Sequence, residues 1–148
     1  MVSFETEPTQ VPIHEVSIEW YDTDVSYESY YDTETLELLA HLIYCEQGES
    51  SYECLCGVGS VVINRVNSPY FPDTVYDVIY QKGQYTGTWW MWNRTPSEDA
   101  YRAAAQVLTT GPTLPEYVTG QGTVPCDGWA VYCYIDGCCF SYPLNGRL

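Results

Sequence analysis

Basic residues are scarce in this chain of 148 residues, which holds 20 Asp and Glu against 5 Lys and Arg. Arg65 is the first of them, so the whole stretch before it lacks Lys and Arg. Such an acidic surface repels phosphate backbones, and we therefore expect no nucleic-acid partner. No hydrophobic run approaches membrane-spanning length, and the acidic N-terminus lacks the apolar core of a signal peptide. We therefore expect no membrane insertion.

Histidine is almost as scarce, because His14 and His41 are its only positions. His14 falls in a segment without periodicity, and His41 lies one turn from Cys45 on the same predicted helix. A catalytic Cys/His pair therefore has little support.

Cysteine is plentiful, with seven residues, but the number is odd and two pairs are too close in sequence to bridge easily. Four of the seven surround one predicted hairpin, namely Cys126, Cys133, Cys138 and Cys139. Their spacing is not the paired C-x-x-C of a structural zinc site. We expect no metal and no cofactor.

The chain divides by composition into two parts. Residues 1–32 are rich in Glu, Asp, Ser, Thr and Tyr without sustained periodicity, which predicts an acidic, largely irregular arm. Residues 33–148 are long enough for one domain with its own core.

Local patterns predict a mainly helical α+β domain. Helices are expected from an N-cap at Thr33 to the stop at Gly48, from Ser50 or Ser51 to about residue 66, from an N-cap at Asp73 to Tyr80, and from Ser97 to Gly111. The segment 81–96 is expected to be a Trp-rich loop. Two short strands should then form a hairpin about Asp136-Gly137.

The first of these helices contains a misplaced acid. Leu39, Ile43 and Glu46 share one face at helical spacing, so the carboxyl group of Glu46 should meet the core near the helix end. Desolvation there raises a carboxyl pKa, as a general acid near neutral pH requires. Spacing alone leaves the alternatives open: Glu46 could turn to water or pair with Arg65.

Spaced blocks of sequence resemble the SleB/CwlJ-type cell wall hydrolases. They include "YCEQGE", "VINRV", "FPDTVYDVIYQ" and "QYT", in family order over about residues 36–86, and "PSEDAYRAAAQVL" continues the match. The resemblance implies a lysozyme-like or lytic-transglycosylase-like domain that cuts peptidoglycan glycan strands with one glutamate. By that resemblance Glu46 is the catalytic glutamate, and the other motif positions expected to bind substrate are Glu49, Asn64, Gln84 and Tyr85.

One carboxyl group can suffice for such chemistry. A glycosidase normally uses two carboxyl groups, whereas a lytic transglycosylase lets one glutamate protonate the glycosidic oxygen and then deprotonate the C6 hydroxyl of the sugar. We expect a lytic transglycosylase or a muramidase-type hydrolase, a monomer that acts on peptidoglycan at the extracytoplasmic cell wall, either as a mature form or as a phage-type lysin. The alternative is a glycan-binding module that keeps the groove without cutting, because Cys45 and Gln47 depart from the family pattern.

The predicted loop supplies candidate sugar platforms. Trp89, Trp90 and Trp92 lie there, and an exposed indole can stack on the apolar face of a pyranose. Any single one of the three could instead plug the domain under the loop.

Overall fold

The structure, a computed structural model, describes residues 31–145. Residues 1–30 of the predicted arm lie outside the described residues. Among the described residues the helices are α1 (Thr33–Gln47), α2 (Tyr52–Val66), α3 (Val75–Ile79), the 3-10 helix η4 (Met91–Asn93) and α4 (Glu98–Thr110). The strands β1 (Gly120–Gly122), β2 (Trp129–Ile135) and β3 (Cys138–Pro143) form an antiparallel sheet in the order β1-β3-β2. The predicted mainly helical α+β class is confirmed.

Helix capping follows the sequence with two corrections. Asp32, not Thr33, caps α1, because its Oδ1 accepts from the backbone N–H of Thr35 at 2.7 Å. Thr74, not Asp73, caps α3 by accepting from the N–H of Asp77. In each case the neighbouring residue is also a good N-cap, and the side chain at the extended position just before the helix makes the bond. The predicted caps Ser51 and Ser97 are confirmed.

The predicted hairpin is confirmed at β2 and β3. Asp136 and Gly137 both adopt positive φ, at 50° and 84°, as a two-residue hairpin turn of the right twist requires. Two elements were not predicted: the three-residue strand β1, which pairs with β3, and η4 within the expected loop.

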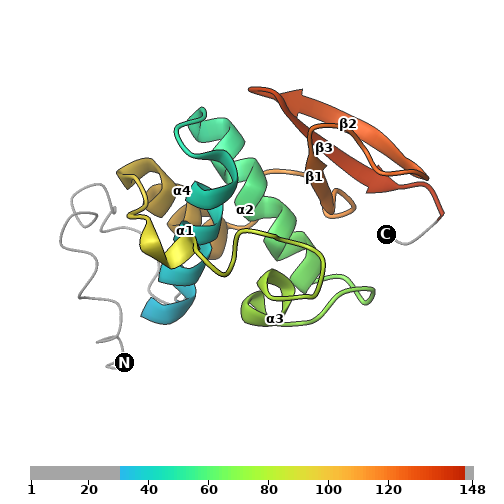
Figure 1. The fold of residues 1–148 in the computed structure, drawn as a ribbon. Helices are drawn as coiled ribbons and strands as arrows, with labels where there is room; N and C mark the ends of the chain where they lie inside the picture. The colour runs from blue at the N-terminus through green and yellow to red at the C-terminus, as the bar shows by residue number, and fades with distance from the viewer. Residues whose placement is uncertain (1–30, 146–148) are drawn as a thin grey trace.

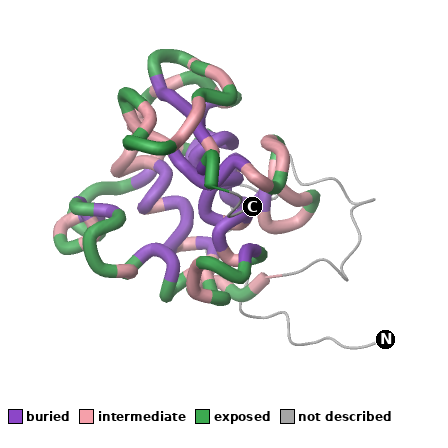
Figure 2. The backbone as a smooth tube through the Cα atoms, turned by 90° about the vertical axis from the view of Figure 1, so that its right-hand side faces the viewer, coloured by how far each residue is buried: buried purple, intermediate pink, exposed green. Residues whose placement is uncertain are grey.

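The core lies where α1, α2 and α4 pack together. Its fully buried side chains include Leu39, Leu42, Ile43, Val58, Val62 and Val107. The buried stretches of the tube in Figure 2 gather in the interior of the domain. None of the helices within residues 31–145 is both long enough and apolar enough to cross a membrane.

The sheet joins the helices through α2. Figure 1 shows the three strands on the side of α2 that faces away from α1 and α4. Phe140 of β3 is fully buried, and its ring occupies the space beside Gly57, where a Cβ would lie 2.6 Å from Cζ of Phe140. Gly57 is therefore required at this close approach of helix and sheet. The contact fixes the sheet, and with it β1, relative to the end of α1.

Candidate active site

Glu46 lies in the last turn of α1, half-buried beside a fully buried face. Leu39 and Ile43, which share its face, have no exposed surface. Burial raises the pKa of the Glu46 carboxyl group above its ordinary value, while a hydrogen bond from Gln121 and the charge of Arg65 act in the opposite direction. The residues described form no ion pair between Glu46 and Arg65. The half-buried position agrees with the predicted placement of Glu46 near the core, and the direction of its pKa shift is the one that a general acid requires.

Gln121 is the hydrogen-bond partner of Glu46. Its Nε2 donates to Oε1 of Glu46 at 3.1 Å across 75 positions of sequence. The residue stands in the middle of β1, paired with Phe140 of β3. Sequence reasoning missed Gln121, because the short segment Gly120–Gly122 shows no strand pattern and its pairing is entirely long-range.

Arg65 of α2 organises the surroundings of Glu46. Its Nε donates to the carbonyl of Thr119 at 2.7 Å and its Nη1 donates to Oε1 of Gln84 at 2.9 Å. The guanidinium also lies over the ring of Tyr85, 5.5 Å from the centroid. A buried planar cation with fixed donors can hold several segments at once. Here it joins α2 to the chain before β1 and to the segment after α3.

Asn64 is buried and fully engaged with backbone. Its Nδ2 donates to the carbonyl of Pro115 at 2.8 Å and to that of Val118 at 2.9 Å, and the residue is only 2% exposed. This geometry positions the segment that leads into β1. Contact of Asn64 with substrate stays a prediction. The two hydrogen bonds show that Asn64 holds the segment before β1 in place.

Gln84 and Tyr85 are neighbours in sequence that differ in exposure. Gln84 is exposed, whereas Tyr85 is 7% exposed and its hydroxyl has no hydrogen-bond partner among the described residues. Burial raises the pKa of Tyr85, Arg65 lowers it and Glu46 raises it. Tyr85 therefore belongs to the same electrostatic neighbourhood as Glu46 and Arg65.

Glu49 lies past Gly48 on the surface. It is exposed, and its Oε2 accepts from the hydroxyl of Tyr44 at 3.1 Å. The guanidinium of Arg94 covers the Tyr44 ring at 5.3 Å and the Trp90 ring at 5.6 Å. Glu49 is thus part of an exposed polar and aromatic surface that continues into the Trp-rich segment.

The three tryptophans differ in environment. Trp89 is 81% exposed and meets Trp90 edge to face. Trp92, 48% exposed, stacks on His41 with ring centroids 4.3 Å apart and donates from Nε1 to the hydroxyl of Tyr80 at 3.0 Å. Trp89 is therefore the more exposed of these two, its sugar contact stays a prediction, and Trp92 joins η4 to α1 and to the end of α3.

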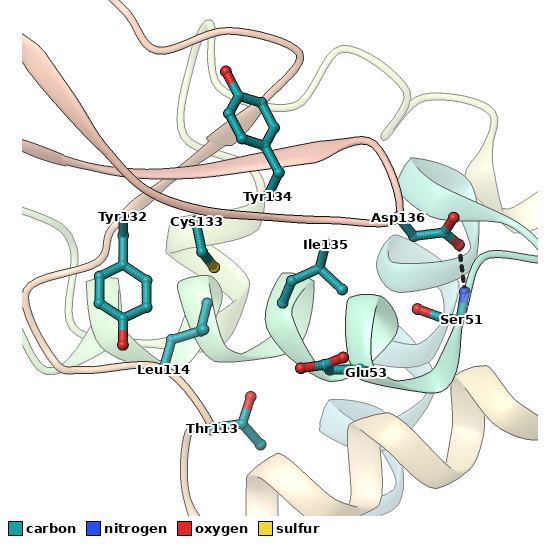
Figure 3. Close-up of a pocket in the computed structure, with 9 residues that line it drawn as sticks. All are labelled: Ser51, Glu53, Thr113, Leu114, Tyr132, Cys133, Tyr134, Ile135 and Asp136. Atoms are coloured by element: carbon teal, nitrogen blue, oxygen red, sulfur yellow. Dashed lines mark hydrogen bonds between the residues drawn. The ribbon is translucent and has the colours of Figure 1, made fainter.

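A cavity of about 620 Å³ lies elsewhere, between the start of α2, the chain after α4 and β2 (Figure 3). Tyr132, Tyr134 and Ile135 contribute from β2, and Oδ2 of Asp136 accepts from the N–H of Ser51 at 2.8 Å. Glu53 of α2 also lines it. None of the predicted site residues does. Glu46, half-buried and hydrogen-bonded to Gln121, stays the predicted catalytic residue.

The part of the chain described in the structure holds no cluster of three or more His, Cys, Asp or Glu side chains arranged to bind a metal ion. The cysteines of residues 31–145 are free thiols. Burial raises the pKa of Cys138 to about 12, so this thiol is held in its neutral form.

Solved structures define the fold class. The catalytic domain of the SleB protein of Bacillus cereus aligns with a TM-score of 0.67 at 23% identity, over 80% of this chain and 96% of that chain. The catalytic domain of the germination-specific lytic transglycosylase SleB of Bacillus anthracis aligns with a TM-score of 0.66 at 21% identity, over 74% of this chain and 95% of that chain. The fold is therefore that of the SleB catalytic domains.

Sequence comparisons show which known proteins the chain resembles. The family model described as Cell Wall Hydrolase matches residues 49–118. The spore cortex-lytic enzyme of Halalkalibacterium halodurans is 35% identical over 82 residues, which cover 53% of this chain and 24% of that protein. The spore cortex-lytic enzyme of Bacillus subtilis is 37% identical over 51 residues, which cover 34% of this chain and 17% of that protein. Residues 49–118 are therefore similar to the cell wall hydrolases, and the predicted resemblance to the SleB/CwlJ-type family is confirmed.

The curated relatives match this chain over only part of their length. The chain spans less than a quarter of the length of the curated relatives. The predicted catalytic residue Glu46 lies outside the segment that the family model matches, as does Gln121, whereas the predicted substrate-binding residues lie within it. The roles of individual residues stay predictions.

Proposed function

We propose that this chain cleaves the glycan strands of bacterial peptidoglycan, with Glu46 as both general acid and general base. The observation that carries the proposal is the half-buried Glu46 carboxyl group, whose pKa burial raises and whose Oε1 is held by Gln121. The family match and the relatives named as spore cortex-lytic enzymes support peptidoglycan as the substrate. That substrate lies outside the cytoplasmic membrane, and we place the activity there.

The chemistry needs only one carboxyl group if the enzyme is a lytic transglycosylase. Protonated Glu46 gives its proton to the glycosidic oxygen as the bond from that oxygen to C1 breaks. The C6 hydroxyl oxygen of the same sugar then bonds to C1, and its proton returns to the Glu46 carboxylate. The products are a 1,6-anhydro sugar end and a free hydroxyl on the leaving strand, so protons and bonds balance.

The positions of the other acids favour this version over a two-carboxyl hydrolase. Glu49, the nearest acid in the motif, is exposed and accepts a hydrogen bond from Tyr44. Glu53 and Asp136 line the separate cavity of Figure 3. A two-carboxyl glycosidase requires its second acid across the scissile bond from the first. A substrate hydroxyl as nucleophile removes that requirement.

Digestion of purified sacculi tests the proposal directly. Mass analysis of the released muropeptides should show 1,6-anhydro ends, and Glu46→Gln should abolish their release. Reducing ends in place of anhydro ends would assign a muramidase-type hydrolase. If wild type and Glu46→Gln bind sacculi equally and neither releases fragments over a broad pH range, the chain is a glycan-binding module and the proposal fails.

A further inference from the structure

Gln121 of β1 forms a hydrogen bond with Glu46 of α1. Its Nε2 donates to Oε1 of Glu46 at 3.1 Å. We propose that Gln121 is a positioning residue, which fixes the orientation of the Glu46 carboxyl group and leaves Oε2 as the oxygen that carries and returns the proton. This inference rests on the proposed function, because it assigns Gln121 a part in the same reaction.

The amide selects between the two carboxyl oxygens. An N–H donor stabilises negative charge on the oxygen that it contacts, so a proton on the carboxyl group prefers the other oxygen. Proton transfer to a glycosidic oxygen depends on holding the acid within hydrogen-bond reach and at the right angle. A carboxyl group at the end of a Glu side chain would otherwise rotate freely about its last bond.

Rigid elements hold Gln121 in place. β1 pairs with β3 on one side, with Gln121 opposite Phe140, and Phe140 is anchored in the core against Gly57. Two residues earlier in the chain, the carbonyl of Thr119 accepts from Nε of Arg65 at 2.7 Å. The strand that carries Gln121 is thus fixed in two ways, by its pairing with β3 and by the bond from Arg65 to the residue just before the strand. A side chain on such a strand is well suited to a supporting contact in an active site.

The neutral amide also suits the charge around Glu46. Arg65 of α2 lowers the pKa of Glu46, and Glu46 in turn raises the pKa values of Cys45 of α1 and Tyr85 of the segment after α3. Gln121 adds a donor from β1 without a further full charge. A cationic residue in its place would favour the carboxylate more strongly and remove the proton that the acid step needs.

Gln121→Met in the full chain tests the inference, because Met keeps the length of the side chain and removes the donor. The matched control is Gln106→Met on α4, where the Tyr52 hydroxyl donates to Oε1 of Gln106 at 2.8 Å. Two quantities are measured for each protein. One is the rate of muropeptide release from sacculi as a function of pH. The other is the pKa of the Glu46 carboxyl group, followed by the ¹³C chemical shift of its carboxyl carbon, a signal that is assigned by its absence in Glu46→Gln.

The expected result for Gln121→Met is a loss of about 10- to 100-fold in rate. The pKa of Glu46 and the alkaline limb of the rate profile should both move to higher pH, because a bond that favours the carboxylate has been removed. Gln106→Met should lose stability without either shift. An unchanged rate and unchanged Glu46 pKa in Gln121→Met overturn the positioning role while the proposed function stands. A wild-type protein that cleaves no sacculi overturns the proposed function itself, and with it this role.

Discussion

The guanidinium of Arg65 donates from Nη1 to Oε1 of Gln84 at 2.9 Å, although Arg65 is 7% exposed and Gln84 is on the surface. The same guanidinium lies over the rings of Phe71 and Tyr85, with its central carbon 4.9 and 5.5 Å from their centroids. A buried cation that meets amide and carbonyl oxygens and aromatic faces depends on its planar shape as much as on its charge.

Arg65→Lys should therefore destabilise the domain although the charge is kept. A lysine cannot reproduce both donors or the flat stacking surface, so the buried carbonyl of Thr119 and the amide oxygen of the exposed Gln84 lose their partner. We expect a loss of about 2 kcal/mol in the free energy of unfolding, measured by urea denaturation. Arg102→Lys is the control, because Arg102 forms a solvent-exposed pair with Asp99 at 3.4 Å and should change stability by less than about 0.5 kcal/mol. Equal effects of the two substitutions would contradict the prediction.

Glu46→Gln should separate activity from stability. Removing the proton donor should lower the rate of glycan cleavage by about 100- to 10,000-fold. Because burial raises the folded pKa of Glu46, its contribution to stability is complete below the ordinary Glu pKa and is lost as pH rises through the higher folded value. The free energy of unfolding of Glu46→Gln should thus improve relative to wild type across that window, as urea denaturation from pH 4 to neutral pH would show.

Removal of one negative charge from an acidic chain needs its own control. Glu116→Gln serves, because Glu116 is exposed in the turn between α4 and β1 and is not part of a helix. A Glu46→Gln protein that is less stable than wild type by more than about 2 kcal/mol at neutral pH would show that Glu46 is a structural residue.

Gly57→Ala should be destabilising even though alanine is the better helix former. The gain in helix propensity is about 1 kcal/mol, but the new Cβ would lie 2.6 Å from Cζ of Phe140 in a fully packed junction, where overpacking costs about 1 to 3 kcal/mol. Phe140→Leu removes the atoms that clash. In a double-mutant cycle, Gly57→Ala should cost less in the Phe140→Leu background than in wild type, and additive effects would disprove the contact.

Trp89→Ala should mainly weaken binding to sacculi, whereas Trp92→Ala should mainly lower stability. Trp89, which is 81% exposed, should change stability by less than about 0.5 kcal/mol and weaken retention on sacculi by about 2- to 10-fold. Trp92→Ala removes the stacking on His41 and the bond to Tyr80, and should lower the free energy of unfolding by about 1 to 2 kcal/mol. Sacculus pelleting and urea denaturation of both variants decide the assignment.

Local signals account for what the sequence could predict. The helices from Thr33, Tyr52 and Glu98 follow from apolar spacing, caps and stops, and the hairpin follows from Asp136-Gly137 between alternating residues. The misassigned caps were neighbours of the true ones. Glu46 could be singled out because its anomaly, an acid on an apolar face, is visible within one helix.

Long-range pairing accounts for what the sequence could not predict. β1 exists only because β3 offers it backbone partners, and Gly-Gln-Gly has no β-propensity of its own. The contact from Gln121 to Glu46 depends on that strand and spans 75 positions. The packing of Asn64 against the carbonyls of Pro115 and Val118 is equally invisible in the sequence, where Asn64 is simply one letter of a motif.

The last turn of α1 holds Glu46 and no basic side chain, and the helix ends at Gln47, with the N–H of Gly48 bonded to the carbonyl of Tyr44. The carbonyl end of a helix carries a partial negative charge from the aligned peptide dipoles. Beside the burial that chiefly raises the pKa of Glu46, the backbone itself thus disfavours a carboxylate at this point. The direction of the chain matters for this reason. In the first turn of a helix the same glutamate would lie in a field that favours the carboxylate and lowers its pKa.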